Sequence, residues 1–209
     1  MEVVGDDAEG EGGKRRGLLV VVSAPSGAGK STIVKGLLEG DENLRLSVSM
    51  TTRVPREGEV DGVDYRFIDD ATFDRVVKDD GFAEWAEVHD HKYGTPADFI
   101  EAETEAGHDV LLDIDVQGAR AIREGYPDAV LVFIAPPSVE ELERRLRSRG
   151  TEDAEEIERR LATGVQELDA WPDYDYLVVN DDVGTAVDTI FAIITAELHR
   201  TARLDSAKE

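Results

Sequence analysis

A run of small residues that ends in a lysine–serine pair constrains the fold of this chain most. Residues 24–32 read Ala-Pro-Ser-Gly-Ala-Gly-Lys-Ser-Thr, between the apolar run 18–22 and the amphipathic stretch 33–38. A buried strand, a glycine turn and a helix are the context of a phosphate-binding loop, whose backbone N–H groups surround phosphate oxygens. Lys30 would reach the β- and γ-phosphates, and the Ser31 hydroxyl would ligate Mg²⁺. The pattern predicts a nucleoside triphosphate site; an ordinary glycine-rich turn is the alternative.

The loop departs from the usual motif at its first position, which is alanine rather than glycine. Alanine costs little there if its φ is negative, and the second half of the motif is intact. The helix that follows aims the positive end of its dipole at the same anion. The predicted ATP-binding residues of this loop are Ala24, Pro25, Ser26, Gly27, Ala28, Gly29, Lys30, Ser31 and Thr32.

The charge and composition exclude several classes of function. Asp and Glu number 47 against 23 Lys and Arg, a formal net charge of −24, so a nucleic-acid surface, which needs a basic footprint, is not expected. There is no cysteine, which excludes disulfides and thiolate chemistry. No apolar stretch approaches the length of a membrane span. We expect a cytoplasmic protein without membrane contact, as a monomer or homodimer. Its acidic surface suits either a salt-rich cytoplasm or an ordinary one.

Strands and helices alternate along most of the chain. Residues 1–16 lack periodicity and are expected to be a disordered tail, followed by one domain over 17–209. Apolar runs that predict strands of a parallel sheet, with helices between them, lie at 18–22, 110–114, 129–134 and 177–179. Helices are predicted from about 70, over 138–149 and 152–168, and at the end of the chain. Shorter strands are predicted at 44–50, 65–68, 82–88 and 92–95, so that 47–96 forms an insertion beside the sheet.

This insertion carries a second cluster of polar residues. Arg53 and Arg56 lie three residues apart with Pro55 between them, in a loop rich in hydroxyl groups. Two guanidinium groups on a stiff backbone can converge on one phosphate. Ser49 and Tyr65 could each add a hydroxyl contact. On this pattern alone, surface ion pairs with Glu57 and Glu59 are the favoured alternative.

Five motifs occur in an order that resembles guanylate kinase, a nucleoside-monophosphate kinase. They are the phosphate loop, Thr51-Thr52-Arg53-x-Pro55-Arg56-x-Gly58-Glu59 with Asp64-Tyr65, Glu84-Trp85, Tyr93-Gly94-Thr95, and Asp113-x-Asp115-x-Gln117-Gly118. The resemblance extends from about residue 17 to about residue 198. It implies an α/β fold with a P-loop NTPase-type parallel sheet flanked by helices. It also implies that 47–96 is a GMP-binding insertion and that 137–168 is a helical lid.

The resemblance assigns the acceptor site to the insertion. Ser49, Arg53, Arg56 and Tyr65 would hold the phosphate of GMP, with help from Tyr93. Glu84 would accept hydrogen bonds from guanine N1–H and the exocyclic amine, neither of which adenine offers at those positions. Thr95 would address O6, and Asp115 would lie near the same base. The alternative for Glu84 is an ordinary surface carboxylate.

The resemblance also implies the residues that act on the transferred phosphoryl group. Asp113, at the end of its predicted strand, would act on Mg²⁺ through a water molecule; a capping role is its alternative. Arg149 and Arg160 match the lid arginines, and with Lys30 and Arg53 they form the predicted catalytic set. Asn180 matches the adenine-contacting turn. Arg145 is a further candidate for a lid arginine. Arg144, Arg147 and Arg159 lie nearby, and a solvated face paired with glutamates is the general alternative for the arginine cluster.

The reaction implied is reversible phosphoryl transfer from ATP to GMP, and also to dGMP, with Mg²⁺. Two other functions remain open at this point. One is a non-catalytic module that binds protein ligands in the GMP groove, for which Lys30 and the lid arginines would have no use. The other is a kinase of the same fold that acts on a different phosphate acceptor, such as a ribose phosphate; Glu84 and Thr95 together favour guanine.

Overall fold

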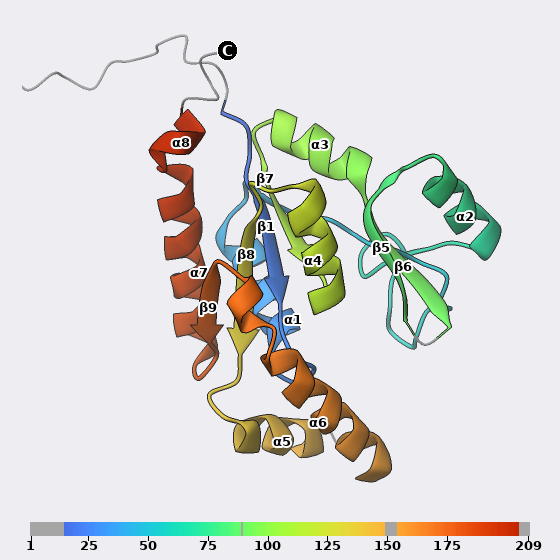
Figure 1. The fold of residues 1–209 in the computed structure, drawn as a ribbon, viewed down its shortest axis with the longest axis vertical. Helices are drawn as coiled ribbons and strands as arrows, with labels where there is room; N and C mark the ends of the chain where they lie inside the picture. Colours follow the sequence, from blue (N-terminus) through green and yellow to red (C-terminus); the bar gives the residue numbers. More distant parts are fainter. Residues whose placement is uncertain (1–14, 89, 149–153, 205–209) are drawn as a thin grey trace, which may run out of the picture.

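A five-stranded parallel sheet forms the centre of the fold in the computed structural model, which describes residues 15–88, 90–148 and 154–204. The strand order is β2-β7-β1-β8-β9. β1 (Leu19–Ser23), β7 (Asp109–Asp113) and β8 (Val130–Ala135) lie in the middle, and β2 (Leu44–Leu46) and β9 (Tyr176–Val179) form the edges. Figure 1 shows β1, β8 and β9 pointing toward one end of the molecule.

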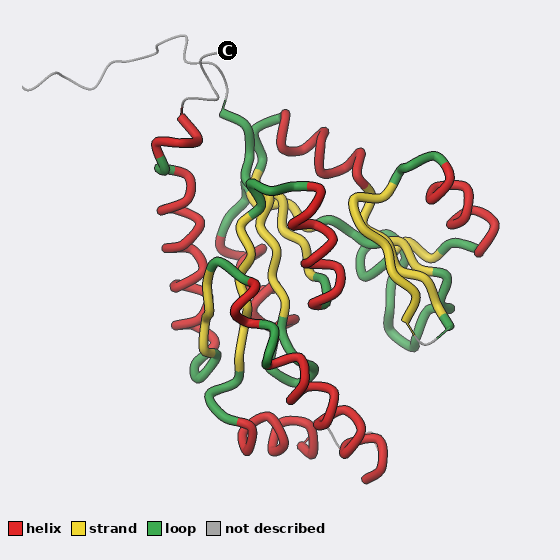
Figure 2. Tube along the Cα trace, viewed as in Figure 1, coloured by secondary structure: helices red, strands yellow, loops and turns green. Residues whose placement is uncertain are grey.

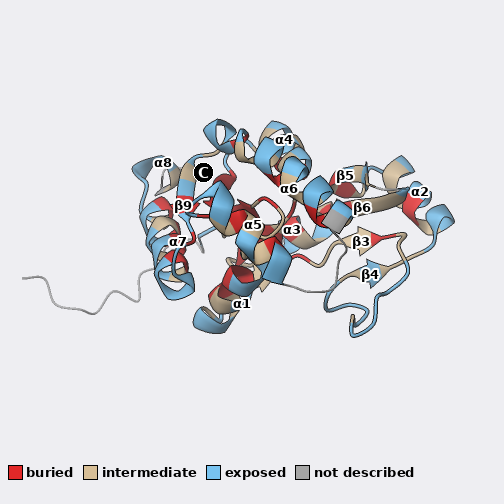
Figure 3. Ribbon diagram, turned by 90° about the horizontal axis from the view of Figure 1, so that it is seen from below, coloured by how far each residue is buried: buried red, intermediate tan, exposed pale blue. Residues whose placement is uncertain are grey.

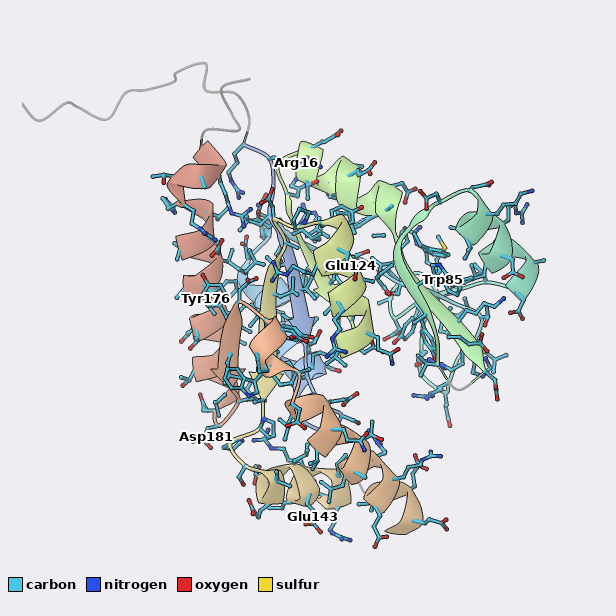
Figure 4. All side chains as sticks on the ribbon, viewed as in Figure 1. Arg16, Trp85, Glu124, Glu143, Tyr176 and Asp181 are labelled. Carbon is cyan, nitrogen blue, oxygen red and sulfur yellow. The ribbon has the colours of Figure 1, made fainter. Side chains whose placement is uncertain are left out.

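The central strands are apolar on both faces because helices cover both faces. α1 (Lys30–Gly40) and α7 (Val183–Leu198) pack on one side, where their buried residues join β1 and β8 in one apolar cluster. α3 (Ala97–Glu105) and α4 (Val116–Gly125) pack on the other side, and Ile100 and Ile122 join a second cluster. Figure 3 shows the buried residues concentrated between these layers.

A second, smaller sheet lies to one side of the first (Figures 1 and 2). Its strands are β3 (Met50–Thr51), β4 (Arg66–Phe67), β5 (Phe82–Val88) and β6 (His91–Pro96), in the order β4-β3-β6-β5. α2 (Asp70–Lys78) covers it, and the ring of Phe73 lies 4.6 Å from that of Phe82. The two sheets share no strand, and Ala83 of β5 packs against the second apolar cluster of the large sheet.

Two helices lie at the end of the large sheet toward which its strands point (Figure 1). α5 (Val139–Ser148) and α6 (Ala154–Leu168) pack against each other through Leu142, Leu146 and Ile157. A short 3₁₀ turn, Trp171–Asp173, leads to β9, and α8 (Thr201–Leu204) follows α7. Among the described residues, no helix is long and apolar enough to cross a membrane.

The structure confirms the predicted α/β parallel sheet flanked by helices, with one correction to its strands. The strand predicted at 44–50 is wrong as a single element, because its two ends belong to different sheets. β2 pairs with β7, and Ser47 N still donates to Leu111 O, after which the chain crosses to β3 in the small sheet. Hydrophobic alternation alone cannot reveal where a strand changes partner.

The predicted disordered tail, 1–16, falls mostly outside the described residues. Its last two residues are described, and Arg15 belongs to the folded domain. The guanidinium of Arg15 donates two hydrogen bonds, 2.9 and 3.1 Å long, to the carboxylate of Asp109 at the start of β7. Arg15 therefore contacts the central sheet, although the prediction placed it in the tail.

Candidate active site

The loop between β1 and α1 has the backbone shape that the glycine pattern predicts. Gly27 and Gly29 have φ values of 96° and 94°, and Ala28 N donates to Pro25 O at 3.0 Å. Ala24 is not among the residues with positive φ, so the alanine at the first motif position carries no backbone strain. The loop lies at the carboxyl end of β1, where open parallel sheets bind ligands.

Close packing gives a second reason for both glycines. A Cβ on Gly27 would lie 2.9 Å from a methyl group of Leu146 in α5. A Cβ on Gly29 would lie 2.4 Å from Nδ2 of Asn180. The loop is therefore held between α5 and the end of β9, and neither position can accept a larger side chain without a shift.

Lys30, Ser31 and Asp113 gather where β1 and β7 end. Lys30 Nζ lies 2.6 Å from Asp113 Oδ1 and donates to Ile114 O at 3.0 Å. Ser31 follows in the first turn of α1 with an exposed side chain. The cation of Lys30 and the carboxylate of Asp113 are thus brought together from sequence positions that lie far apart.

Asn180 and Arg145 hold the phosphate loop from the side. Asn180 is 1% exposed, and its Nδ2 donates to Ala28 O at 2.7 Å. Arg145, from α5, donates to the same carbonyl at 3.2 Å and to Asn180 O at 3.0 Å. In this structure Asn180 therefore braces the loop, and its buried Oδ1 has no hydrogen-bond partner among the described residues.

The arginines of α5 and α6 divide into two groups. Arg144, Arg147 and Arg159 pair with glutamates one turn away, which agrees with the solvated-face alternative. Arg160 instead reaches the phosphate loop, where Nη2 lies 2.5 Å from Ser26 Oγ. Arg149, the other predicted lid arginine, lies outside the described residues.

Arg53 lies in a cluster of aromatic and acidic groups beside the small sheet. Its two terminal nitrogens donate to the carboxylate of Glu59 at 3.0 and 2.8 Å, so the predicted alternative of an ion pair is present. Its guanidinium carbon lies 5.5 Å from the ring centroid of Tyr65. Arg53 Nε is buried and has no hydrogen-bond partner among the described residues, which leaves one donor for an anion.

The other predicted phosphate ligands surround this cluster. The ring of Tyr93 lies 5.9 Å from that of Tyr65 in an edge-on arrangement. The side chain of Arg56 is exposed, and its backbone N–H donates to Glu59 at 2.7 Å. Ser49 precedes β3 and is partly buried. Burial and then the negative charge of Asp113 raise the pKa of Tyr65.

Glu84 is a buried carboxylate and not an ordinary surface group. It lies on β5, is 9% exposed, and accepts a hydrogen bond of 2.5 Å from the hydroxyl of Thr95 on β6. Burial raises the pKa of Glu84, the Thr95 hydroxyl opposes that rise, and the charge of Asp115 adds to it. A Cβ on Gly118 would lie 3.0 Å from Glu84 Oε2, so the start of α4 approaches the carboxylate closely.

Asp115 has a structural role that the motif did not predict. Its Oδ1 accepts hydrogen bonds from the backbone N–H groups of Gln117 and Gly118, which caps the start of α4. Gly118, which Asp115 caps, approaches Glu84 closely, and the charge of Asp115 adds to the raised pKa of Glu84.

Sequence patterns predicted neither the loop contacts of Arg145, a further candidate for a lid arginine, nor any role for Glu167. The roles of Arg145 and Glu167 depend on contacts with residues 117 and 141 positions away. Their sequence signal, a charged residue on a predicted helix, is the same as that of a solvated face.

Comparisons with known proteins agree with these features. Residues 16–197 match the family model described as guanylate kinase. A guanylate kinase of Caldanaerobacter subterraneus subsp. tengcongensis is 51% identical over 190 residues, which cover 91% of this chain and 92% of the relative. A guanylate kinase of Sphingopyxis alaskensis is 52% identical over 184 residues, covering 88% and 84%. The crystal structure of guanylate kinase from Anaplasma phagocytophilum, 38% identical, covers 91% of this chain and 90% of its own, with a TM-score of 0.76.

Proposed function

Because this chain belongs to the guanylate kinase family and transfers a phosphoryl group from ATP to GMP, we propose that the two polar clusters of the candidate site are the two halves of its active site. The phosphate loop and Lys30 bind ATP. The cluster around Arg53, together with Glu84, binds GMP. The observation that carries this proposal is the close approach of Glu84 to the start of α4, where a Cβ on Gly118 would lie 3.0 Å from Glu84 Oε2; α4 follows β7, which ends at Asp113.

The proposed acceptor site recognises phosphate and base separately. Arg53 offers its buried Nε to the phosphate, and four neighbours complete the anion site: Ser49, Arg56, Tyr65 and Tyr93. Glu84 accepts hydrogen bonds from the guanine N1–H and amine, while Thr95 fixes the orientation of the carboxylate. A buried carboxylate that the wrong base leaves unpaired can discriminate by a factor of about 10⁴. None of these residues is assigned to the ribose 2′-hydroxyl, so we propose that dGMP is accepted as well.

The proposed donor site is built on the phosphate loop. Backbone N–H groups between Gly27 and Ser31 bind the phosphates, and Lys30 exchanges its ion pair with Asp113 for the β- and γ-phosphates. Asn180 has a buried Oδ1 without a described partner, which suits the exocyclic amine of adenine.

The residues present fit a magnesium ion. Ser31 and Asp113 offer hard oxygen donors beside the loop, and no group of three metal-binding side chains occurs among the described residues. Mg²⁺ commonly binds through one or two protein oxygens plus substrate phosphates and water. When bound, the ion neutralises charge on the transferred phosphoryl group.

The chain's own residues position the reactants and stabilise charge. An oxygen of the GMP phosphate is already anionic near neutral pH, so it attacks the γ-phosphorus of ATP without a general base. The bond to the β,γ-bridging oxygen breaks, and ADP leaves with that electron pair. Lys30, Arg53, Arg149 and Arg160 stabilise the charge on the oxygens. We propose that the insertion 47–96 and the lid 137–168 close over both substrates and exclude water.

The test is ADP production from Mg-ATP with GMP, dGMP, AMP, UMP, a ribose phosphate or no acceptor, at low and molar KCl. Turnover with GMP and dGMP alone, lost on addition of EDTA and restored by Mg²⁺, is the expected result. Turnover with another acceptor would overturn the role of Glu84. Binding of nucleotide without turnover would favour a binding module. The cytoplasm, where ATP and GMP occur, is the proposed location.

A further inference from the structure

Ser26, in the phosphate loop, is held by α6 through two different groups. Its hydroxyl contacts Arg160, and its backbone N–H donates to Oε2 of Glu167 at 3.3 Å. The mechanism above uses Arg160 but gives no role to Glu167. A half-buried carboxylate bonded to the backbone of a catalytic loop therefore remains unexplained.

The spacing along α6 shows that these contacts form one interface. Arg160 and Glu167 lie seven residues apart, which is about two helical turns, so their side chains lie on the same face. Gly164 lies between them and is buried: a Cβ there would lie 3.6 Å from Pro25 Cβ and 3.7 Å from Ser26 O. One stripe of α6 thus rests directly on the loop, with Arg160 near one end and Glu167 near the other.

The Glu167 carboxylate is half-buried where it contacts the phosphate loop. Burial raises its pKa, the Ser26 N–H opposes that rise, Asp115 adds to it, and Lys30 lowers it. Glu167 is therefore within electrostatic reach of two residues of the proposed active site while it belongs to the lid region.

We propose that Glu167 is a positioning residue that fixes α6 on the phosphate loop, so that Arg160 is aimed at the transferred phosphoryl group. This inference rests on the proposed role of Arg160 and extends it. Glu167 acts through the Ser26 N–H and touches neither substrate. A fixed α6 keeps Arg160 in one position relative to the phosphate loop. A positive charge that is already in place stabilises the transition state of phosphoryl transfer without tighter binding of the substrates.

The experiment first measures kcat and both KM values for three single variants of the full chain. Glu167→Ala should lower kcat about tenfold, the effect of one lost hydrogen bond to a charged group, with the KM for GMP unchanged. Glu167→Gln keeps an oxygen that can accept from Ser26 N–H and should stay within about twofold of wild type. Glu158→Ala removes the same charge from an exposed position of α6 and is the matched control. Cooperative thermal unfolding of each variant establishes that it folds.

A double substitution separates positioning from a general structural effect. If Glu167 acts through Arg160, Glu167→Ala in an Arg160→Ala background should lower kcat less than about twofold further. The inference would be overturned if the two substitutions lowered kcat by the product of their separate effects. It would also be overturned if Glu167→Gln lowered kcat as much as Glu167→Ala, or if Glu167→Ala left kcat normal. An Arg160→Ala enzyme with normal kcat would instead overturn the proposed role of Arg160, and the inference would fail with it.

Discussion

Glu84→Gln tests base recognition with almost no change in side-chain shape. The Thr95 hydroxyl donates to Oε1 of Glu84, so it will hold the carbonyl oxygen of the glutamine in that position. The amide nitrogen then takes the place of Oε2, where it cannot accept a hydrogen bond. One of the two guanine donors loses its acceptor, and the other faces a neutral oxygen instead of a carboxylate.

The expected loss follows from these two changes. A hydrogen bond to a charged group contributes about 1.5–3 kcal/mol, and a neutral one about 1 kcal/mol. One charged hydrogen bond is lost and the other is weakened to a neutral one, which together amounts to about 3 kcal/mol. The value of kcat/KM for GMP should therefore fall by a factor of about 10². The assay is initial-rate kinetics with GMP varied and ATP saturating. Glu87→Gln, on the exposed side of the same strand, is the matched control.

Glu84→Gln should raise the stability of the folded protein although it lowers activity. The raised pKa of Glu84 means that the folded protein holds this proton more tightly than the unfolded chain does. The stability from that proton is complete below the ordinary pKa of 4.5 and is lost as the pH rises through the raised value. Glutamine is uncharged at every pH, so Glu84→Gln should unfold at a higher temperature than wild type at pH 8, and this difference should shrink on acidification. A normal kcat/KM for GMP, or an equal loss in the Glu87 control, would refute the role of Glu84.

Three further predictions concern the loop and the surface. Asn180→Ala removes a buried donor to Ala28 O and should lower stability by about 2 kcal/mol, or Tm by about 4–8 °C by calorimetry, and raise the KM for ATP; a normal Tm would contradict the bracing role. Gly29→Ala combines a φ of 94° with a clash against Asn180, so titration calorimetry should detect no ATP binding, whereas Gly125→Ala, with no neighbour within 4 Å of its added Cβ, should bind normally. If the net charge of −24 reflects adaptation to salt, activity and Tm should both rise between low and molar KCl; equal values would refute that origin.

The features that were predictable from the sequence depend on neighbouring residues. The phosphate loop was predictable because the strand, the two glycines, Lys30 and the start of the helix are consecutive. The ion pair of Arg53 with Glu59 was predictable as an alternative because the two residues lie only six positions apart in the sequence. The central strands were predictable because they are unbroken apolar runs, which are typical of strands buried on both faces.

The features that were missed depend on distant residues. The bracing role of Asn180 was not predicted, because its side chain is bonded to a carbonyl 152 residues away; its contact with adenine stays a prediction. The strand predicted at 44–50 looks continuous, but its halves pair with β7 and with β4 and β6. Such partners are set by tertiary packing, and a single sequence carries no periodic signal for them.

The carbonyl of Ala28 accepts hydrogen bonds from two sources that differ in their attachment to the fold. Asn180 extends from the end of β9 in the central sheet, whereas Arg145 extends from α5. If α5 moves away, the carbonyl keeps its bond to Asn180, and Arg145 can be solvated in the opened space. Separation of the helix from the loop therefore leaves the carbonyl of Ala28 with one hydrogen bond, whereas the carbonyl of Asn180 loses its bond to Arg145. Because Ala28 O has two donors, its contact with α5 can break and form again while Asn180 keeps the loop attached to the end of β9.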